Sequence, residues 1–325
     1  MPLPRAAAAI LLILIPVTSS FAQTNEQMSR PTFPEKVWGE TTDDLMFGDR
    51  GNVKDNDSPY NLFMWDSIGR FRLDANDPNS TNIGYRYLTI DFGDKAEDVP
   101  DQLDEVSVAA TVHFPQSDGT RFSLLFGAGY SGDNPYADPG GVFGIGSLIY
   151  QRPLNDRDTL YLSLDYNGVG PLFPDVPLPG IAWARRGQQL SWEIGFPHDA
   201  LHWQFAPEWS LDVNYRVPFT ADVAVSYQLS DSFSLVGRYA NVFNGFRLDD
   251  EPAENRAFFE VSRVEIGIRY VNPHLVFDWA YVDATLSVGY AFNQELSSGF
   301  DARDLDDFAQ LSDEPYIGFM LRSRF

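Results

Sequence analysis

The stretch Trp209–Gln228, WSLDVNYRVPFTADVAVSYQ, decides the fold of this chain. Apolar side chains occupy the odd positions from Trp209 to Tyr215, and polar side chains occupy the even positions between them. After Val217 and Pro218 the alternation resumes and continues to Gln228. A period of two is the signature of a β-strand with one apolar and one polar face, and the short break permits a tight reversal. This stretch therefore predicts two antiparallel strands.

The same unit recurs from Ile83 to the end of the chain, as segments of about ten residues separated by breaks. Short breaks, such as Pro115–Gly119, alternate with long acidic ones, such as Ser131–Gly141 and Asn293–Glu314. About ten tilted residues are enough to cross the hydrocarbon core of a membrane. Because every second residue is polar, such strands escape hydropathy plots, and the mean hydropathy here is -0.24. We therefore expect an all-β fold, a single transmembrane antiparallel up-and-down β-barrel.

Composition narrows the possible functions. The chain has 325 residues and no cysteine, which excludes thiolate chemistry and disulfides. Its 46 acidic and 23 basic residues give a net charge of -23, the wrong sign for a nucleic-acid partner. No Gly-x-Ser-x-Gly motif occurs. These features predict neither an enzyme nor a nucleic-acid-binding protein.

The N-terminus resembles a secretory signal peptide. Arg5 precedes the apolar run Ala6–Val17, and Ser20, Phe21 and Ala22 form a small-x-small cleavage site. We therefore expect residues 1–22 to be removed on export. Residues 23–82 lack a clear period and are expected to form a periplasmic tail, a plug or an extra strand. The barrel itself is expected at residues 83–325.

Tyrosines close many of the predicted strands and lie in the apolar register. An amphipathic ring at the end of an apolar face suits a membrane–water interface. The sequence therefore predicts an aromatic girdle of Tyr130, Tyr166, Tyr215, Tyr227, Tyr239, Tyr270 and Tyr290.

The last strand carries the most specific pattern. Counting back from Phe325 in steps of two, Leu321, Phe319 and Ile317 are apolar, and only Ser323 departs from the pattern. This resembles the terminal-strand signature of Gram-negative outer-membrane β-barrel proteins, including barrel families of unknown function. The resemblance implies the outer membrane as the location. It implies membrane lipid, lipopolysaccharide and the barrel assembly machinery as partners, and leaves the oligomeric state open.

The strand count follows from the position of the ends. Both the processed N-terminus and the last strand of such a barrel lie in the periplasm, so the number of strands is even. Of about thirteen candidates, the weakest is Tyr60–Phe71, whose two faces are not separated by polarity, and dropping it leaves about 12 strands. The alternative is about 14, with a hidden strand near Asp43–Gly51 or Ile181–Arg186.

The polar register of the strands predicts which residues line the lumen. The candidates are Arg86, Arg121, Asp165, Glu193, Asp212, Arg216, Asp222, Arg238, Glu265, Arg269, Asp283 and Arg322. Charges of both signs would orient polar solutes in a wide pore, or pair across a narrow lumen and fill it. We expect a porin-like channel for small polar solutes. A non-conducting structural or surface-binding barrel is the alternative, ahead of a secreted soluble β-sandwich and an outer-membrane enzyme.

Few residues could hold a metal or catalyse a reaction. His113, His198, His202 and His274 all fall at or beside predicted periplasmic turns. His198 and His202 have the spacing of helical metal ligands, but Pro197 and the flanking aromatic residues favour a turn. The acidic loops, including Asp301, Asp304, Asp306 and Asp307, could attract Ca²⁺ or Mg²⁺ but lack the spacing of an EF-hand loop. We therefore expect no cofactor, metal centre or catalytic residue.

Overall fold

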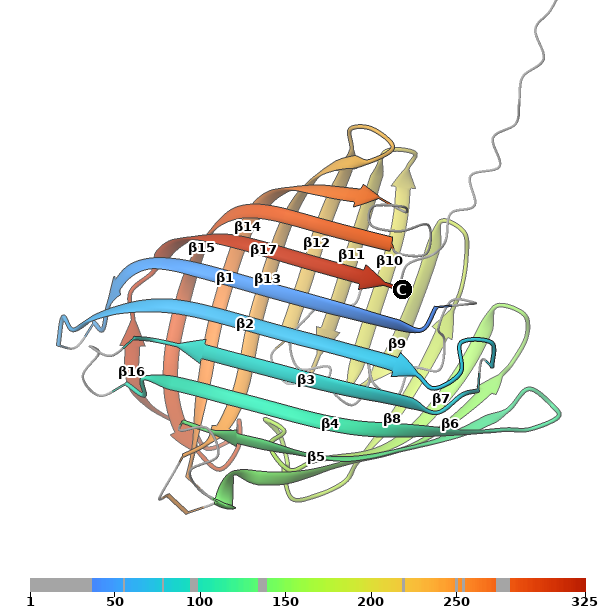
Figure 1. Cartoon of the computed structure of the whole chain (residues 1–325), viewed down its shortest axis with the longest axis horizontal. Helices are drawn as coiled ribbons and strands as arrows, with labels where there is room; N and C mark the ends of the chain where they lie inside the picture. The colour runs from blue at the N-terminus through green and yellow to red at the C-terminus, as the bar shows by residue number, and fades with distance from the viewer. Residues whose placement is uncertain are drawn as a thin grey trace, which may run out of the picture.

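A computed structural model describes residues 37–325, except 55, 78, 94–98, 134–138, 218–219, 249–250, 253–254 and 273–280. The proposed signal peptide and His274 lie outside the described residues. Among those described, no helix is long and apolar enough to cross a membrane. The regular elements are a short 3₁₀ turn, η1 (Pro139–Gly141), and strands that wind into a barrel (Figure 1). The strands are β1 (Gly39–Asn52), β2 (Pro59–Arg72), β3 (Asn82–Asp91), β4 (Gln102–Pro115), β5 (Arg121–Gly132), β6 (Val142–Pro153), β7 (Asp158–Asn167), β8 (Leu178–Arg185), β9 (Leu190–Phe196), β10 (His198–Ala206), β11 (Trp209–Arg216), β12 (Thr220–Gln228), β13 (Phe233–Arg247), β14 (Arg256–Asn272), β15 (Tyr281–Gly299), β16 (Asp306–Leu311) and β17 (Glu314–Arg324).

The sheet closes on itself. Each strand from β1 to β15 pairs antiparallel with the next, and β17 pairs with both β15 and β1. β16 and β17 follow β15 in one register, with Gln294 opposite Leu311 and Ala291 opposite Glu314. They are therefore one wall strand interrupted at Ser312 and Asp313. Among the described residues, seventeen strand segments thus make sixteen wall strands, and both expected counts, 12 and the alternative 14, are wrong.

Four strands of the described chain lie outside the twelve expected ones, and two of them, β1 and β8, cover the stretches named for a hidden strand. β1 and β2 lie within residues 23–82, where Met46, Leu62 and Met64 are buried and alternation of polarity is lost. β8 places Leu178, Gly180, Ala182 and Ala184 on its inner face, so that face is not polar. β10 follows Pro197 directly, and the proline and aromatic residues that favoured a turn begin a strand instead.

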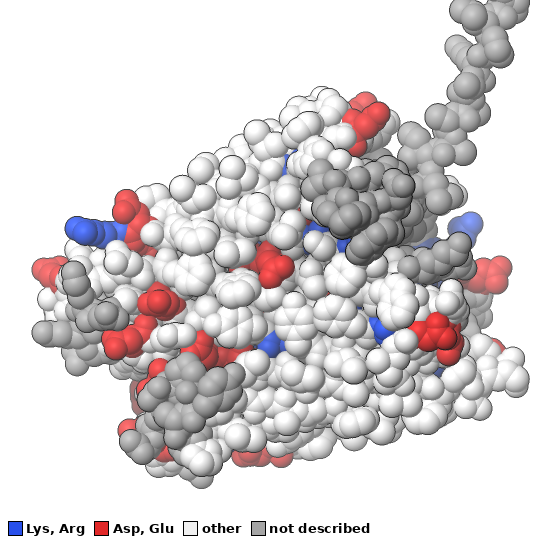
Figure 2. All heavy atoms as spheres, viewed as in Figure 1, with Lys and Arg blue, Asp and Glu red and all other residues white. Residues whose placement is uncertain are grey.

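The outer face of the wall is apolar along most strands. A closed barrel satisfies every backbone hydrogen bond within the sheet, which is what a lipid environment demands. Figure 2 shows a largely uncharged wall between the two ends, with acidic residues gathered toward the end of the β1–β2 connection. The chain is therefore an outer-membrane β-barrel whose lipid-facing side chains include Val108, Leu124, Phe126, Leu148, Leu164, Ile181, Ile194, Leu235, Ile266, Ile268, Leu286, Val288 and Ile317.

The wall is far from uniform in height. β13, β14 and β15 have 15, 17 and 19 residues, whereas β8 to β12 have 8, 7, 9, 8 and 9. We call β1–β4 with β13–β17 the long-strand side, and β7–β12 the short-strand side. The end of the barrel that carries Gly39 and Arg324 is the terminal end, and the opposite one is the loop end. The long-strand side extends past the short one at the loop end (Figure 1).

Candidate functional site

An apolar cluster fills the lumen at the loop end of the long-strand side. Inner-face residues of β1–β4 pack against those of β13–β17, although most of these strands are not neighbours in the wall. The Phe92 ring, directly after β3, and the Phe259 ring of β14 meet edge-to-face with centroids 5.4 Å apart. We call this cluster the apolar plug; it comprises Met46, Val53, Tyr60, Leu62, Met64, Leu88, Ile90, Phe92, Val99, Leu103, Val242, Phe246, Ala257, Phe259, Val261, Ala291, Leu296, Ala309, Leu311 and Tyr316.

The loop-end part of the β13–β14 hairpin is buried on both faces. One face contributes Val242 and Phe259 to the apolar plug. On the other face, the Phe243 and Phe258 rings stack with centroids 5.4 Å apart. Arg256, only 1% exposed, donates hydrogen bonds to the carbonyl oxygens of Val169 (2.5 Å) and Gly170 (3.0 Å). The β7–β8 connection therefore covers the hairpin from the side opposite the plug.

Val169 extends the closure to the remaining wall. It packs in a second apolar cluster with Ala109, Leu125, Phe143 and Ile145, which lie on the inner faces of β4, β5 and β6. The outward neighbours of these residues, such as Val108 and Val142, are exposed, which fixes the direction of the clustered side chains. The hairpin and this connection thus close the lumen with the protein's own chain.

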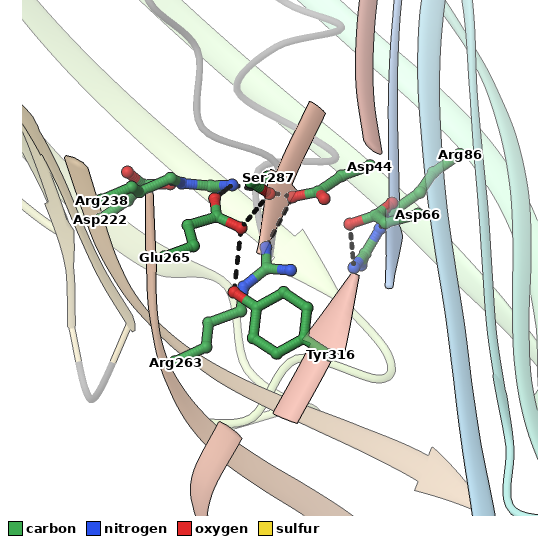
Figure 3. Close-up of polar contacts among 9 residues, drawn as sticks. All are labelled: Asp44, Asp66, Arg86, Asp222, Arg238, Arg263, Glu265, Ser287 and Tyr316. Atoms are coloured by element: carbon green, nitrogen blue, oxygen red, sulfur yellow. Dashed lines mark hydrogen bonds and ion pairs between the residues drawn. The ribbon is translucent and has the colours of Figure 1, made fainter. Parts of the chain in front are cut away.

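A network of buried charges lies next to the plug, toward the terminal end. Asp44 of β1 accepts hydrogen bonds from Arg263 (2.6 Å) and from Arg238 (3.2 Å), which come from β14 and β13. Arg238 also donates to Asp222 through two nitrogens, at 2.6 and 2.9 Å. Figure 3 shows these side chains converging from opposite parts of the wall. Because each charge has a partner of opposite sign, the network tolerates burial.

Glu265 connects the network to β15 and β17. Its carboxylate accepts hydrogen bonds from Arg238 (3.0 Å), from the Ser287 hydroxyl (2.8 Å) and from the Tyr316 hydroxyl (2.9 Å) (Figure 3). Tyr316 also belongs to the apolar plug. The polar network and the plug therefore share a residue and form one continuous obstruction.

A second group of charges crosses the lumen from β3. The Arg86 guanidinium lies 3.3 Å from Asp66 of β2 and 3.0 Å from Glu105 of β4. It also donates to the side-chain oxygen of Asn244 on β13, at 3.3 Å. All four residues are almost fully buried. This contact fastens the β13 side of the closure to the opposite wall.

The inner face of the short-strand side is more exposed to solvent than the plug. His202 lies 2.6 Å from Asp212, and Glu193 lies 3.6 Å from His198. The inner-facing residues of β7–β9 are mostly half-buried, in contrast to those of the plug. A cavity of about 40 Å³ lies between this side and the charge network, with Asp212, Ser226, Thr285 and Arg322 among its lining residues. A volume of this size holds a few water molecules.

The structure places all twelve predicted lumen residues on inner faces of the strands. Arg86, Asp222, Arg238 and Glu265 belong to the buried groups described above. Arg269 and Arg322 lie 2.6 and 3.7 Å from the same carboxylate oxygen of Asp283, near the terminal end. The remaining residues lie elsewhere along the inner wall: Arg121, Asp165, Glu193, Asp212 and Arg216.

The predicted girdle is only partly at the surface. Tyr215, Tyr239 and Tyr290 are exposed on the outer face, and Tyr166, Tyr227 and Tyr270 are half-buried. Tyr130 is 6% exposed, because η1 brings Gly141 against its ring. β13 and β15 continue beyond Tyr239 and Tyr290, so these two tyrosines lie within their strands rather than at the strand ends.

The predicted assembly residues lie on the strand that closes the barrel. Ile317, Phe319 and Leu321 share the outer face of β17, and β17 pairs with β1. The Phe325 ring packs against Phe71 of β2, with centroids 5.9 Å apart.

Two of the histidines do not lie where the turn interpretation put them. His198 and His202 lie on β10, which corrects the turn expected between Pro197 and Pro207. His113, on the inner face of β4, contacts the Ser123 hydroxyl at 2.8 Å and the Asn82 amide at 3.0 Å. Within the described part of the chain, no group of three or more histidine, aspartate or glutamate side chains is arranged to hold a metal ion.

Sequence reasoning missed Asp44, Asp66 and Arg263, which are central to the closure. Asp44 and Asp66 lie in the segment that the pattern left outside the barrel. A signal was present for Arg263, since it shares the inner register of Glu265 and Arg269 on β14. Asp66 sits among apolar residues of β2, and an isolated charge in such a run indicates a buried ion pair.

Comparison with known proteins gives only distant likenesses. No family model matches the chain, and no curated protein does. A Pseudomonas aeruginosa FadL homologue is 9% identical, with 93% of each chain covered and a TM-score of 0.43. The "TodX deltaS2S3 mutant monoaromatic hydrocarbon channel" is 10% identical, with 94% of this chain and 95% of that one covered, and a TM-score of 0.42. The outer membrane protease OmpT from Escherichia coli is 10% identical over 90% of this chain and 98% of that one, with a TM-score of 0.24. Similarity this low supports no conclusion about function.

Proposed function

We propose that this barrel is a gated outer-membrane passage for small polar solutes, and that the structure is its closed form. The observation that carries the proposal is the position of the obstruction. The apolar plug occupies the loop end, while the inner wall beyond it toward the terminal end is polar and contains a cavity. A pathway sealed at one end and polar along the rest is a gated one.

The chemistry of the inner wall defines the class of solute. Arg238, Arg269 and Arg322 lie on the same stretch of wall as Asp212 and Asp222. Opposed charges of this kind solvate polar groups and exclude hydrocarbon, because an apolar solute would strip water from them without replacing its hydrogen bonds. The solutes that fit are therefore small, hydrophilic and hydrogen-bonding.

The β13–β14 hairpin is the element that would move. It is held by the apolar plug on one face and by Arg256 and the β7–β8 connection on the other. Its movement would separate the Phe92 and Phe259 rings and leave the polar network exposed to water. The paired charges would then line the opened lumen.

A non-conducting structural barrel is the second candidate, and the same plug favours it. An apolar cluster whose members are almost wholly buried costs free energy to open. If the plug never opens, the barrel serves only as a structural element of the membrane or as a surface for binding.

Conductance in planar bilayers separates the two. We expect the native protein to conduct rarely, and the double variant Phe92→Ala with Phe259→Ala to conduct in frequent discrete steps. The matched control is Phe122→Ala with Phe126→Ala, which removes two rings from the exposed outer face and should leave conductance unchanged. Heat-modifiable gel migration checks that each variant is folded. A folded plug variant that remains silent would establish the structural role.

A further inference from the structure

We propose that Glu314 is a proton-sensitive latch on the apolar plug, which keeps it closed when the carboxyl is protonated and releases it when the carboxyl ionises. The inference rests on the proposed gating function and adds its regulation. Glu314 is the first residue of β17 and lies opposite Ala291, a member of the plug. It is one position beyond the Tyr290–Pro315 pair, and so outside the membrane-spanning part of the wall.

The carboxyl group is enclosed. Glu314 is 1% exposed and points to the inner side of the wall, as does Tyr316 two residues later. On the β1 side it abuts the backbone of Gly48, where an added Cβ would lie 2.6 Å from its Oε1 atom. Neither carboxylate oxygen has a well-formed hydrogen bond among the described residues. In such a place the ionised carboxylate costs far more free energy than the neutral carboxyl.

The polar groups around Glu314 make their short hydrogen bonds to other groups or are acidic. The Tyr60 hydroxyl of β2 and the Gln294 amide of β15 both donate to the carbonyl oxygen of Ser312, at 2.9 and 2.7 Å. Asp49 of β1 and Asp313 of the adjoining turn are acidic. No arginine or lysine pairs with Glu314 in the part of the chain that the structure describes.

These surroundings change how readily the group ionises. Burial raises the pKa of Glu314 to about 8, the Gln294 amide opposes that rise, and Asp49 adds to it. Burial, together with the nearby Glu314, also raises the pKa of Tyr60. In an opened plug, water would reach Glu314 and its pKa would return toward the usual value near 4.5.

The direction of the effect follows from proton linkage. The closed form holds a proton that the open form releases, because the pKa of Glu314 is higher in the closed form. Closure is therefore favoured at low pH and weakens as pH rises, by up to about tenfold in the open-to-closed ratio per pH unit below about 8. Above the raised pKa the ratio becomes constant. We expect the passage to be shut in acid and to open in mildly alkaline conditions.

Two measurements test the latch, and the first is conductance. Open probability of the native protein should rise between about pH 5.5 and about pH 9. Glu314→Gln keeps the size of the side chain but cannot ionise, so it should stay closed across that range. Asp49→Asn removes a neighbouring acid that is already exposed, and should retain most of the pH response.

The second measurement does not depend on conduction. Since the chain has no cysteine, Ala257→Cys places a single thiol inside the plug. Its reaction with a water-soluble maleimide, divided by that of the same thiol in the Glu314→Gln background at the same pH, should rise with pH. This ratio cancels the ordinary ionisation of the thiol. A rising ratio without conductance would support the latch and contradict the passage. A ratio independent of pH would overturn the latch, whether or not the protein conducts.

Discussion

The long-strand and short-strand sides are made from the same alternating pattern, yet the residues on their inner faces differ in how far they are buried. On the long-strand side, Met46, Met64, Leu88 and Phe259 are wholly buried against side chains from across the lumen. On the short-strand side, inner residues such as Glu193 and His202 remain partly exposed. The two sides differ in length, so only the longer one has wall that extends past the lipid.

The difference in strand length explains why the apolar plug forms on the long-strand side. A strand that crosses the membrane needs an apolar outer face, and its inner face is free to be polar. The predicted girdle places the edge of the lipid at Tyr239 and Tyr290, and beyond it inner faces can become apolar if they meet one another. They do so in the β13–β14 hairpin and in β1–β3. The hairpin part of the closure therefore lies on wall strands that extend past these tyrosines, whereas plug residues such as Tyr316 lie deeper, beside the lipid-facing Ile317.

Chemical labelling tests the orientation of the barrel in the membrane, on which the comparison of the two sides depends. The resemblance to outer-membrane proteins predicts that the loop end, where the long strands project, lies outside the cell. Asp306→Cys at that end and Asp156→Cys at the terminal end are both exposed acidic positions. A membrane-impermeant maleimide applied to intact cells should label the first and not the second. In permeabilised cells both thiols should be labelled. Labelling of Asp156→Cys but not of Asp306→Cys on intact cells would show that the barrel has the opposite orientation.

Removal of Asp44 should damage the long-strand side severely. Asp44→Ala deletes the carboxylate that Arg238 and Arg263 share. Loss of one partner from a buried ion pair costs about 3–5 kcal/mol, because charge is left uncompensated. Arg185→Ala is the control on the short-strand side, where Arg185 pairs with Asp158 but its side chain is 48% exposed. Its loss should lower the free energy of unfolding by no more than about 1 kcal/mol. Urea unfolding in detergent measures both, and equal effects would contradict the contrast between the sides.

Truncation of one leucine in the plug and of one on the outer face compares how tightly the two are packed, with a smaller expected effect. Leu62 is 1% exposed within the plug, whereas Leu162 is 41% exposed on the outer face of β7. Leu62→Ala should lower the free energy of unfolding by roughly 2–4 kcal/mol, because the cavity inside the plug is not refilled. Lipid or detergent chains can fill the space left by Leu162→Ala, so its effect should stay below about 1 kcal/mol. The same unfolding experiment compares them, and a larger loss for Leu162→Ala would show that the plug is loosely packed.

The two sides also explain how much the sequence reveals. Trp209–Gln228 predicts a hairpin correctly, because β11 and β12 face lipid on one side and a polar lumen on the other. In β2, Tyr60, Leu62 and Met64 face the plug while Phe63 and Trp65 lie on the opposite face, so no alternation of polarity survives. The partners of Asp44 lie some two hundred residues away along the chain, and only closure of the ring brings them together. Inner register could thus be predicted strand by strand, but the contacts across the lumen could not.

The acidic loop end should bias the opened passage modestly toward cations. Asp306 and Asp307 are exposed near the mouth, and their field raises the local concentration of cations. Asp301 is unsuitable for this test, since it is buried and holds Arg303 and the backbone of Phe173. In the plug variant with Phe92→Ala and Phe259→Ala, adding Asp306→Asn and Asp307→Asn should lower the cation preference, read as a shift in reversal potential, with little change in single-channel conductance. The shift should be smaller at about 1 M salt than at about 0.1 M, because the Debye length falls from about 10 Å to about 3 Å. A selectivity that survives high salt would place its source inside the lumen, at the wall charges of the short-strand side, rather than at the projecting loops.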